Sequence, residues 1–424
     1  MQEFRIIFPT LQFYFLPVKN VLYISYDGMT DPLGQSQVIP YLQQLALCGY
    51  NITILSTEKP EKFAQNQQFI RQLLNSSGIG WEIVVYTKNP PVLSTVIDIF
   101  KLRRKVKKLM QTMRFDIVHC RSYISPMAGL MLKKKQGAKF LFDMRGFWAD
   151  ERVDGGLWNL KNPVYKTVYR YFKRKEKQYL EAADHIVSLT HNAKSEMQQW
   201  DFVKFDAGNI SVIPCCADFD FFRIPDTTQR NNSRKKLGFT ENELVLCYLG
   251  SLGTWYMVQE MFDFFSEVLH QYPNARFLII SGDWLNQEAQ KAGIEPGKIT
   301  LISAKRSEVV GLLAAADIGI SFIKPSYSKK SSSPTKQGEM LAMGIPMIVN
   351  KGVGDVDSIV EETQTGIVIP DTTQEAYRMA AMQIPELLQK NKEDIRNRAA
   401  KILDLKVGAA SYKNIYNTLT GDPN

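Results

Sequence analysis

Short apolar runs alternate with amphipathic segments along nearly the whole chain, and each pair predicts a strand followed by a helix. Residues 21–26 and 51–57 are β-branched and aromatic runs typical of buried strands, and 39–49 has helical spacing that ends at Gly49. This order predicts a βαβ unit of a parallel sheet. Further strands are expected at 115–120, 139–146, 185–190 and 209–214, and further helices at 125–135 and 165–184.

The polar, turn-rich stretch 222–236 is the best candidate for a linker, because the alternation restarts after it. Strands are expected at 244–250, 276–282, 299–303, 317–323, 346–350 and 366–370, and helices at 255–270, 285–292, 306–315, 334–343, 373–389 and 391–403. The pattern predicts two doubly wound α/β domains, residues 1–222 and 223–404. A last helical segment, 405–424, is expected to cross back to the first domain. A ligand would lie in the cleft between the domains, beyond the carboxyl ends of the strands.

Charge is divided unequally between these two halves. The 424 residues carry a formal charge of +9, with 45% hydrophobic and 22% charged residues, which are ordinary values for a globular protein. Residues 1–220 hold 29 Lys and Arg against 20 Asp and Glu, whereas residues 221–424 hold 23 of each. The first domain is therefore the half expected to meet an anionic partner.

Cysteine usage and hydropathy bear on the cellular compartment in which we expect the protein. The five cysteines show no metal-ligand spacing, and we expect them to be reduced in a cytoplasmic protein. No apolar run reaches the ~18 residues of a transmembrane helix. The apolar segment 4–16 is expected to pack on the protein, with membrane contact as the alternative.

The strongest candidate site is 331–346 (SSSPTKQGEMLAMGIP). Ser333 suits an N-cap and Pro334 a first helical position, so that a helix beginning here would present an anion-binding tip. Lys336 adds a full charge in the first turn, and Glu339 follows on the same face, within reach of a ribose. A capped surface helix with a solvated Lys/Glu pair is the alternative.

A second candidate is the glycine-containing turn at 248–257 (YLGSLGTWYM). Gly250 and Gly253 would allow close approach of a phosphate to the backbone, and Thr254 could cap the following helix. It matches neither a GxGxxG nor a Walker loop, and an ordinary strand-to-helix turn is the alternative.

Here the sequence resembles retaining GT-B glycosyltransferases of family 4. GEMLAMGIPMIV (338–349) is similar to the family's Glu-x-Ala-Met-Ala-x-Gly-x-Pro-Val-Val segment, and the resemblance runs from about residue 20 to 405. It includes the first-strand loop with Gly34, VIPCCADFDFF (212–222), YLGSLG (248–253) and AAADIGISF (314–322). The resemblance implies two Rossmann-like domains facing each other across a cleft, with a nucleotide-sugar donor on the second and an acceptor on the first.

The resemblance also implies roles for single residues. Glu339 matches the second glutamate of the family's Glu-x7-Glu motif, which binds ribose, and Lys336 would meet the diphosphate. Ser331 stands where the family has the first glutamate, which usually touches the donor sugar, so the identity of the sugar is left open. The remaining donor-side residues are Gly250, Ser251, Gly253, Thr254, Ser333 and Thr335, and those on the acceptor side are Gly34, Gln35 and His191.

A third candidate is FDMRGFWADE (142–151), which follows a predicted strand. Asp143 matches a family position at the mouth of the cleft, near the transferred sugar, where a carboxylate could contact a hydroxyl or stabilise positive charge. Arg145 could bind phosphate through two hydrogen bonds. An Asp–Arg ion pair that organises a loop is the alternative.

Two expected helices carry basic faces. Residues 101–108 hold six basic residues in eight, and the apolar partners of the 96–113 helix include Val96 and Phe100. Helix 165–184 repeats this pattern, and LKKK (132–135) adds a third basic cluster. Such helices suit an anionic membrane surface, although each apolar stripe can equally pack on its own sheet.

The leading prediction is a retaining glycosyltransferase that uses a nucleotide-diphosphate sugar, UDP-linked first and GDP-linked second. The acceptor would be a lipid-linked or cell-envelope glycan, reached at the inner face of the plasma membrane. Two alternatives stay open: a non-hydrolysing UDP-sugar 2-epimerase and a catalytically silent sugar-nucleotide binding protein. We expect no cofactor, no bound metal and no nucleic-acid partner.

Overall fold

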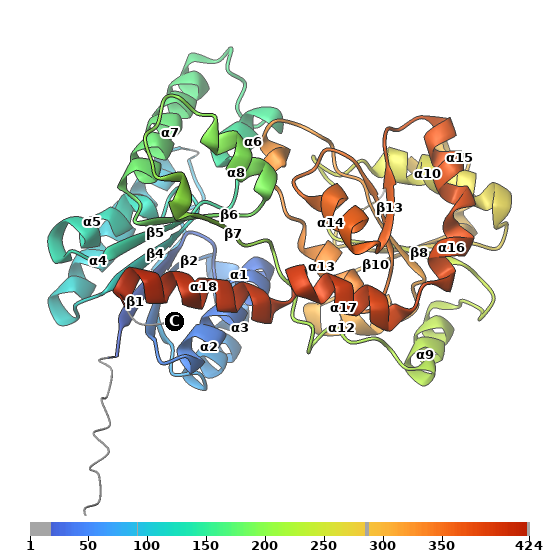
Figure 1. Ribbon diagram of the computed structural model, residues 1–424, viewed down its shortest axis with the longest axis horizontal. Helices are drawn as coiled ribbons and strands as arrows, with labels where there is room; N and C mark the ends of the chain where they lie inside the picture. The colour runs from blue at the N-terminus through green and yellow to red at the C-terminus, as the bar shows by residue number, and fades with distance from the viewer. Residues whose placement is uncertain (1–17, 91, 285–287, 422–424) are drawn as a thin grey trace, which may run out of the picture.

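The computed structural model describes residues 18–90, 92–284 and 288–421, which form two α/β halves (Figure 1). The first half is built on a seven-stranded parallel sheet of order β3-β2-β1-β4-β5-β6-β7. Its strands are β1 (Asn20–Ser25), β2 (Asn51–Glu58), β3 (Gly80–Val85), β4 (Ile117–Arg121), β5 (Lys139–Asp143), β6 (His185–Ser188) and β7 (Ile210–Val212). The helices of this half are α1 (Pro32–Gln37), α2 (Ile39–Leu47), α3 (Pro60–Asn75), α4 (Leu93–Thr112), α5 (Pro126–Gln136), α6 (Trp148–Asp154), α7 (Pro163–Ala182) and α8 (His191–Gln198), with a 3-10 turn η1 (Ala207–Asn209).

The second half is built on a six-stranded parallel sheet of order β10-β9-β8-β11-β12-β13. Its strands are β8 (Val245–Leu249), β9 (Arg276–Ile280), β10 (Ile299–Ile302), β11 (Ile318–Ser321), β12 (Met347–Asn350) and β13 (Gly366–Ile369). The helices are α9 (Thr227–Leu237), α10 (Val258–Gln271), α11 (Glu288–Lys291), α12 (Arg306–Leu313), α13 (Thr335–Ala342), α14 (Val356–Thr363), α15 (Gln374–Met382), α16 (Ile384–Gln389) and α17 (Lys392–Leu403), with 3-10 turns η2 (Pro296–Lys298) and η3 (Ser328–Ser331). Both halves therefore have the expected doubly wound α/β architecture.

Strand residues supply apolar side chains to both faces of each sheet, because successive side chains of a strand point to opposite sides. In β1, Leu22 and Ile24 enter one core while Val21 and Tyr23 enter the core on the other face. In β8, Cys247 belongs to one core of the second half and its neighbours Leu246 and Tyr248 to the other. Helices must therefore cover both faces, as they do in Figure 1.

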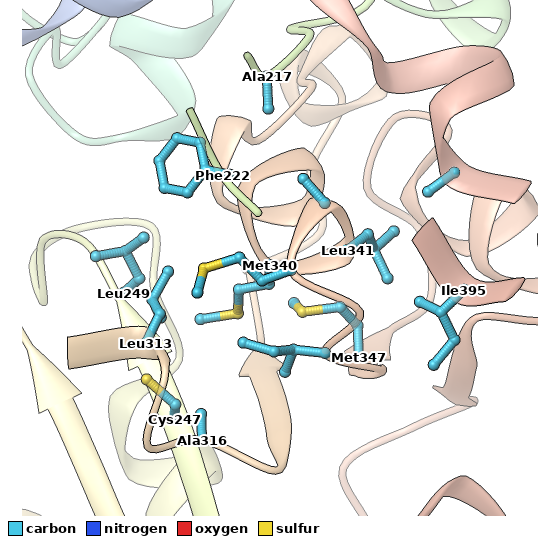
Figure 2. Packing of buried hydrophobic residues seen from close by; sticks show 14 of the residues in the cluster. Ala217, Phe222, Cys247, Leu249, Leu313, Ala316, Met340, Leu341, Met347 and Ile395 are labelled. Atoms are coloured by element: carbon cyan, nitrogen blue, oxygen red, sulfur yellow. The ribbon is translucent and has the colours of Figure 1, made fainter. Parts of the chain in front are cut away.

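The core beneath α13 fixes the helix that carries the main candidate site. Figure 2 shows Met340 and Leu341 of α13 packed toward Met347 of β12. A Cβ at Gly319 of β11 would lie 2.3 Å from Met347 Sδ and 2.4 Å from Met340 Sδ, so that only glycine fits there. Because residues 336–342 are all buried, α13 is held as a rigid part of the second half.

Two chain segments join the halves. Residue Ala217 and the start of the last helix, α18 (Leu405–Thr420), run side by side, with Ala217 N donating to Leu403 O and Leu405 N donating to Ala217 O, both at 2.8 Å. In Figure 1 α18 leaves the second half and lies along the first. It packs on α2, and its Tyr416 hydroxyl lies 2.9 Å from His119 Nδ1 on β4.

Several expectations about local structure were wrong. Most of the predicted linker 222–236 is α9, whose start is fixed by a capping box between Asp226 and Gln229 and whose end is fixed by left-handed Gly238. Part of the expected first-strand loop with Gly34 is α1, and the helix expected at 373–389 is divided into α15 and α16. The pattern did not identify α3, β3, α6, α8 and α14.

Two further observations concern membranes. The apolar segment 4–16 lies outside the described residues. Within the part of the chain that is described, no helix combines the length and apolar character needed to span a bilayer.

Candidate functional site

The amino end of α13 lies at the edge of the second sheet that faces the first half. Pro334, not Ser333, occupies the N-cap position, and its side chain makes no capping hydrogen bond. The Ser333 hydroxyl instead accepts a hydrogen bond from Cys215 N at 3.0 Å, which ties the helix start to the segment that joins the two halves. Thr335 is the first helical residue, so the positive end of the helix dipole points toward this junction.

Lys336 is buried in an aromatic box rather than solvated. Its Nζ lies 2.9 Å from the Tyr248 hydroxyl, and it sits 4.0 Å and 3.9 Å from the ring centroids of Tyr248 and Tyr256. Burial lowers the pKa of Lys336 well below its usual value, and the nearby carboxylate of Glu339 opposes this only in part. An ammonium group held in this way gains strongly from an anion placed beside it.

The turn after β8 makes room for Lys336. Gly250 has φ +126°, and a Cβ there would lie 3.0 Å from Lys336 Nζ, so that a side chain at this position would press on the ammonium group. The expected capping role of Thr254 is wrong: Thr254 has φ +51°, and α10 begins four residues later, at Val258, with Met257 as its N-cap. The turn containing Ser251 and Gly253 is therefore not a second helix tip.

Glu339 is buried one turn along α13 and pairs with a residue that the sequence did not indicate. Arg306, the first residue of α12, places its NH1 3.2 Å from Glu339 Oε1. Burial raises the pKa of Glu339 above its usual value, and Arg306 and Lys336 offset this rise only in part. The pair with Arg306 thus fixes the orientation of the Glu339 carboxylate at the edge of the second sheet.

Asp143 ends β5 in a buried cluster within the first half. Its Oδ2 accepts a hydrogen bond from the Tyr412 hydroxyl at 3.1 Å and lies 3.5 Å from His119 Nε2 and 3.9 Å from Arg121 NH1. Burial alone would raise the pKa of this carboxyl, but Arg145 and His119 hold it below its usual value. Asp143 lines a cavity of about 10 Å³, and its contact with Arg145 agrees with the alternative interpretation, an ion pair that organises this loop.

Arg145 lies between this cluster and the second half. It has φ +56°, and its NH1 is 3.8 Å from Asp143 Oδ1 and its NH2 3.0 Å from Cys215 Sγ. Burial would lower its pKa, yet Cys215 and Asp143 hold it well above the usual value. Its Nε is buried with no hydrogen-bond partner, an arrangement that favours an anionic ligand.

A pocket of about 240 Å³ opens between the two halves. The first half contributes Arg145, Gly146, Glu151 and Leu189, and the second half contributes Trp255, Tyr256, Ile323, Lys329 and residues 331–334. The pocket therefore brings together Arg145, the start of α13 and one wall of the Lys336 box, which are far apart in the sequence. Asp143 does not line it.

The turn η3 holds the two halves together beside this pocket. The Ser331 hydroxyl accepts a hydrogen bond from Phe147 N at 2.8 Å and donates one to Ser328 O at 2.6 Å. Lys329 Nζ lies 2.6 Å from Glu151 Oε1, and Lys330 Nζ lies 2.8 Å from Glu196 Oε2. Ser331 thus has a packing role at the position where a glutamate was the expected residue.

The three residues expected on the acceptor side have different surroundings. Gly34 and Gln35 lie in α1, the first helix after β1, where a Cβ on Gly34 would meet Gly28 O at 2.2 Å and Gln35 Nε2 donates to Thr30 O at 3.2 Å. His191 is exposed at the start of α8, and its backbone N donates to Asp355 Oδ2 at 2.5 Å. It lines a separate cavity of about 310 Å³, not the pocket of Arg145.

Sequence reasoning missed the residues whose importance depends on a partner from another element: Tyr248, Tyr256, Arg306 and Lys329. The aromatic pair in YLGSLGTWYM was the one available signal, since tyrosines around a turn can enclose a cation. Among the described residues, no group of three His, Cys, Asp or Glu side chains is arranged to hold a metal ion.

Comparisons with known proteins identify the family. The model described as Glycosyltransferase Family 4 matches residues 37–221, and the model described as Glycosyl transferases group 1 matches residues 229–402. The alpha-monoglucosyldiacylglycerol synthase of Acholeplasma laidlawii is 23% identical over 349 residues, covering 78% of this chain and 80% of that protein.

Solved structures share the fold over nearly the whole chain. A glycosyltransferase of Rickettsia africae has a TM-score of 0.71 at 16% identity and covers 96% of this chain and 100% of its own. HepE of Anabaena, solved in complex with UDP-glucose, has a TM-score of 0.68 at 13% identity and covers 94% and 99%. The chain is therefore a GT-B enzyme that belongs to the group 1 glycosyltransferases of family 4.

Proposed function

We propose that this glycosyltransferase transfers a sugar from a UDP-linked donor with retention of configuration, to a lipid-linked or cell-envelope glycan. The observation that carries the donor proposal is Lys336, a buried ammonium group whose partners are a phenol and two aromatic rings. Glu339 compensates the cost of burying this lysine only in part, and a diphosphate at the start of α13 would offset the remainder.

Each half contributes to binding the donor. Lys336 and the tip of α13 bind the diphosphate from one side, and Arg145, which lines the pocket, binds it from the other. Glu339, held by Arg306, accepts hydrogen bonds from the ribose. HepE binds UDP-glucose on a similar fold, which supports UDP as the carrier.

The pocket also bears on the mechanism. Its lining carboxylate, Glu151, is ion-paired with Lys329 at 2.6 Å and so is poorly placed to attack a sugar carbon. We therefore favour a front-side mechanism, in which the diphosphate leaves from the same face of the sugar that the acceptor enters. Positioning and stabilisation of the leaving charge by Lys336 and Arg145 then supply most of the catalysis.

Titration of the protein with UDP, GDP and CMP tests the donor proposal. UDP is expected to bind at least ten times more tightly than the other two nucleotides, and incubation with a panel of UDP-sugars should release UDP and an α-configured sugar from at least one of them. Calorimetry and proton NMR of the released sugar provide the two measurements. Recovery of an epimerised donor, or equal binding of all three nucleotides, would contradict the proposal.

The acceptor proposal rests on the surface of the first half. Helix α4 exposes Arg103, Arg104, Lys107 and Lys108, and α5, which packs against it, exposes Lys134 and Lys135. The apolar stripe of α7 does pack on the core through Phe172, Tyr179 and Leu180. The stripe expected on α4 is only partly right: Val106 is buried, but Val96 and Phe100 are 55% and 70% exposed.

Exposed apolar and basic residues on one helix are suited to the interface of an anionic bilayer. The Acholeplasma relative is named for a diacylglycerol product, which supports a lipid acceptor. We place this enzyme at the inner face of the plasma membrane, with α4 against the lipid.

Co-sedimentation with vesicles tests this placement. The protein is expected to bind vesicles containing phosphatidylglycerol and to leave them as salt is raised, because each basic residue near the surface contributes about 1 kcal/mol. A variant with Phe100→Ser and Arg104→Gln should bind roughly tenfold more weakly, whereas Lys236→Gln on α9 should behave as the parent protein. Equal binding to neutral phosphatidylcholine vesicles would remove the electrostatic explanation.

A further inference from the structure

Lys329 is a buried cation in the pocket to which the proposed donor chemistry gives no role. Its side chain is 7% exposed, its Nζ lies 3.9 Å above the Trp255 ring, and its carboxylate partner comes from the other half of the molecule. That partner, Glu151, is 43% exposed and can turn outward into solvent. The lysine is fixed, whereas the carboxylate that neutralises it is removable.

The wall next to Lys329 has little capacity for a second carboxylate from the protein. Ser331 uses its hydroxyl for Phe147 N and Ser328 O, and a Cβ on Gly146 would already lie 3.1 Å from Ser331 Oγ. Position 331 is therefore packed close to Gly146 and carries no charge. The charged groups lining the pocket are Arg145, Lys329 and Glu151, of which two are cations.

In the proposed complex Arg145 binds the diphosphate, and Lys329 is the remaining cation in the part of the pocket that would hold the sugar. A neutral hexose offers this ammonium group only hydroxyl oxygens, which are weaker partners than a carboxylate. A sugar that bears its own carboxylate can replace Glu151 and keep the buried charge paired.

We propose, on the basis of the UDP-donor function above, that the transferred sugar is a hexuronic acid whose carboxylate pairs with Lys329. In the transfer, the bond from the sugar C1 to the UDP oxygen breaks and a bond from C1 to the acceptor oxygen forms. The acceptor hydroxyl gives its proton to the leaving UDP. The C6 carboxylate takes no part in the bond changes and decides which donor is accepted.

Matched donors test the proposal on the full chain: UDP-glucuronate against UDP-glucose, and UDP-galacturonate against UDP-galactose. At least one uronate is expected to bind about 10- to 100-fold more tightly than its neutral counterpart, which is the range of a charge-assisted hydrogen bond. In Lys329→Met this ratio should fall to about one while the affinity for UDP is unchanged. Lys330→Met, the adjacent exposed lysine, should keep the parent ratio.

Glu151→Gln provides an independent arm, because it removes the internal competitor for Lys329. It should tighten binding of the uronate and leave binding of the neutral sugar within about twofold. Equal binding of both members of each pair by the parent protein would overturn the uronate proposal while leaving the UDP proposal intact. An equal loss for UDP, the neutral donor and the uronate in Lys329→Met would assign Lys329 to the diphosphate instead. Failure of the parent protein to bind UDP would overturn both proposals.

Discussion

Replacing Lys336 with methionine is expected to abolish most of the transferase activity and to raise the thermal stability of the free protein. Activity falls because the leaving diphosphate loses a buried charge-assisted hydrogen bond, a loss of about 10²–10³ in kcat. Stability rises because methionine fills the box of Tyr248 and Tyr256 without the cost of burying a charge. Turnover and melting temperature should therefore move in opposite directions.

The pH dependence gives the same substitution a second readout. The pKa of Lys336 is low in the folded free protein and near 10.5 when the chain is unfolded. The unfolded chain therefore binds this proton more tightly, and the free energy of unfolding should rise with pH between these two values. UDP binding should raise the pKa of Lys336 toward its usual value. Between the low and the usual pKa, binding should therefore be accompanied by uptake of a proton.

Calorimetry of UDP binding in buffers of different ionisation enthalpy measures that proton directly. Lys336→Met should show no uptake, and Lys236→Met, on exposed α9, should match the parent protein in both stability and uptake. Unchanged UDP affinity in Lys336→Met would separate this residue from the diphosphate.

Replacing Glu339 with alanine is expected to weaken UDP binding by about 10- to 100-fold, the range of a hydrogen bond to a charged group. The loss should be specific to the ribose, because Glu339 lies one turn beyond the helix tip and faces Arg306. The parent protein should therefore prefer UDP to its 2′-deoxy or 3′-deoxy form, and the variant should bind the three alike. Glu339→Gln should lie in between, since it keeps an acceptor oxygen.

A control for the same experiment is needed because Glu339→Ala leaves Arg306 without its carboxylate. The double variant Glu339→Ala, Arg306→Met removes the uncompensated cation and should bind UDP as weakly as the single variant. If the double variant recovers parent affinity, the effect of Glu339 is electrostatic and does not involve the ribose.

The fold could largely be predicted from the sequence. Its buried parallel strands are short, continuous apolar runs that alternate with amphipathic segments, and this alternation is easily recognised. Strands such as β1 and β8 were placed to within a residue at each end. The failure at α9 has a physical reason: the helix is polar on almost every face, and its capping box and Gly238 were outweighed by its turn-forming composition.

Candidate residues could be related to one another from the sequence only where they lie on one element. Lys336 and Glu339 lie on a single helix, so their spacing predicted a joint role in donor binding. Lys329 and Glu151, or Arg306 and Glu339, come from different parts of the chain, and no local pattern indicates their pairing. The contact of Asp143 with Tyr412 was not indicated for the same reason, because Tyr412 comes from the last helix.

That last helix has a consequence for synthesis on the ribosome. The first half is translated early, yet one face of its core is covered by α18, through Tyr412, Ile415, Tyr416 and Leu419. Until α18 emerges, the apolar face around Tyr23 and Tyr41 stays open to solvent while the second half is being made. The nascent first half therefore completes its core only after α18 has been made, and its exposed face is the natural place for a chaperone to act in the meantime.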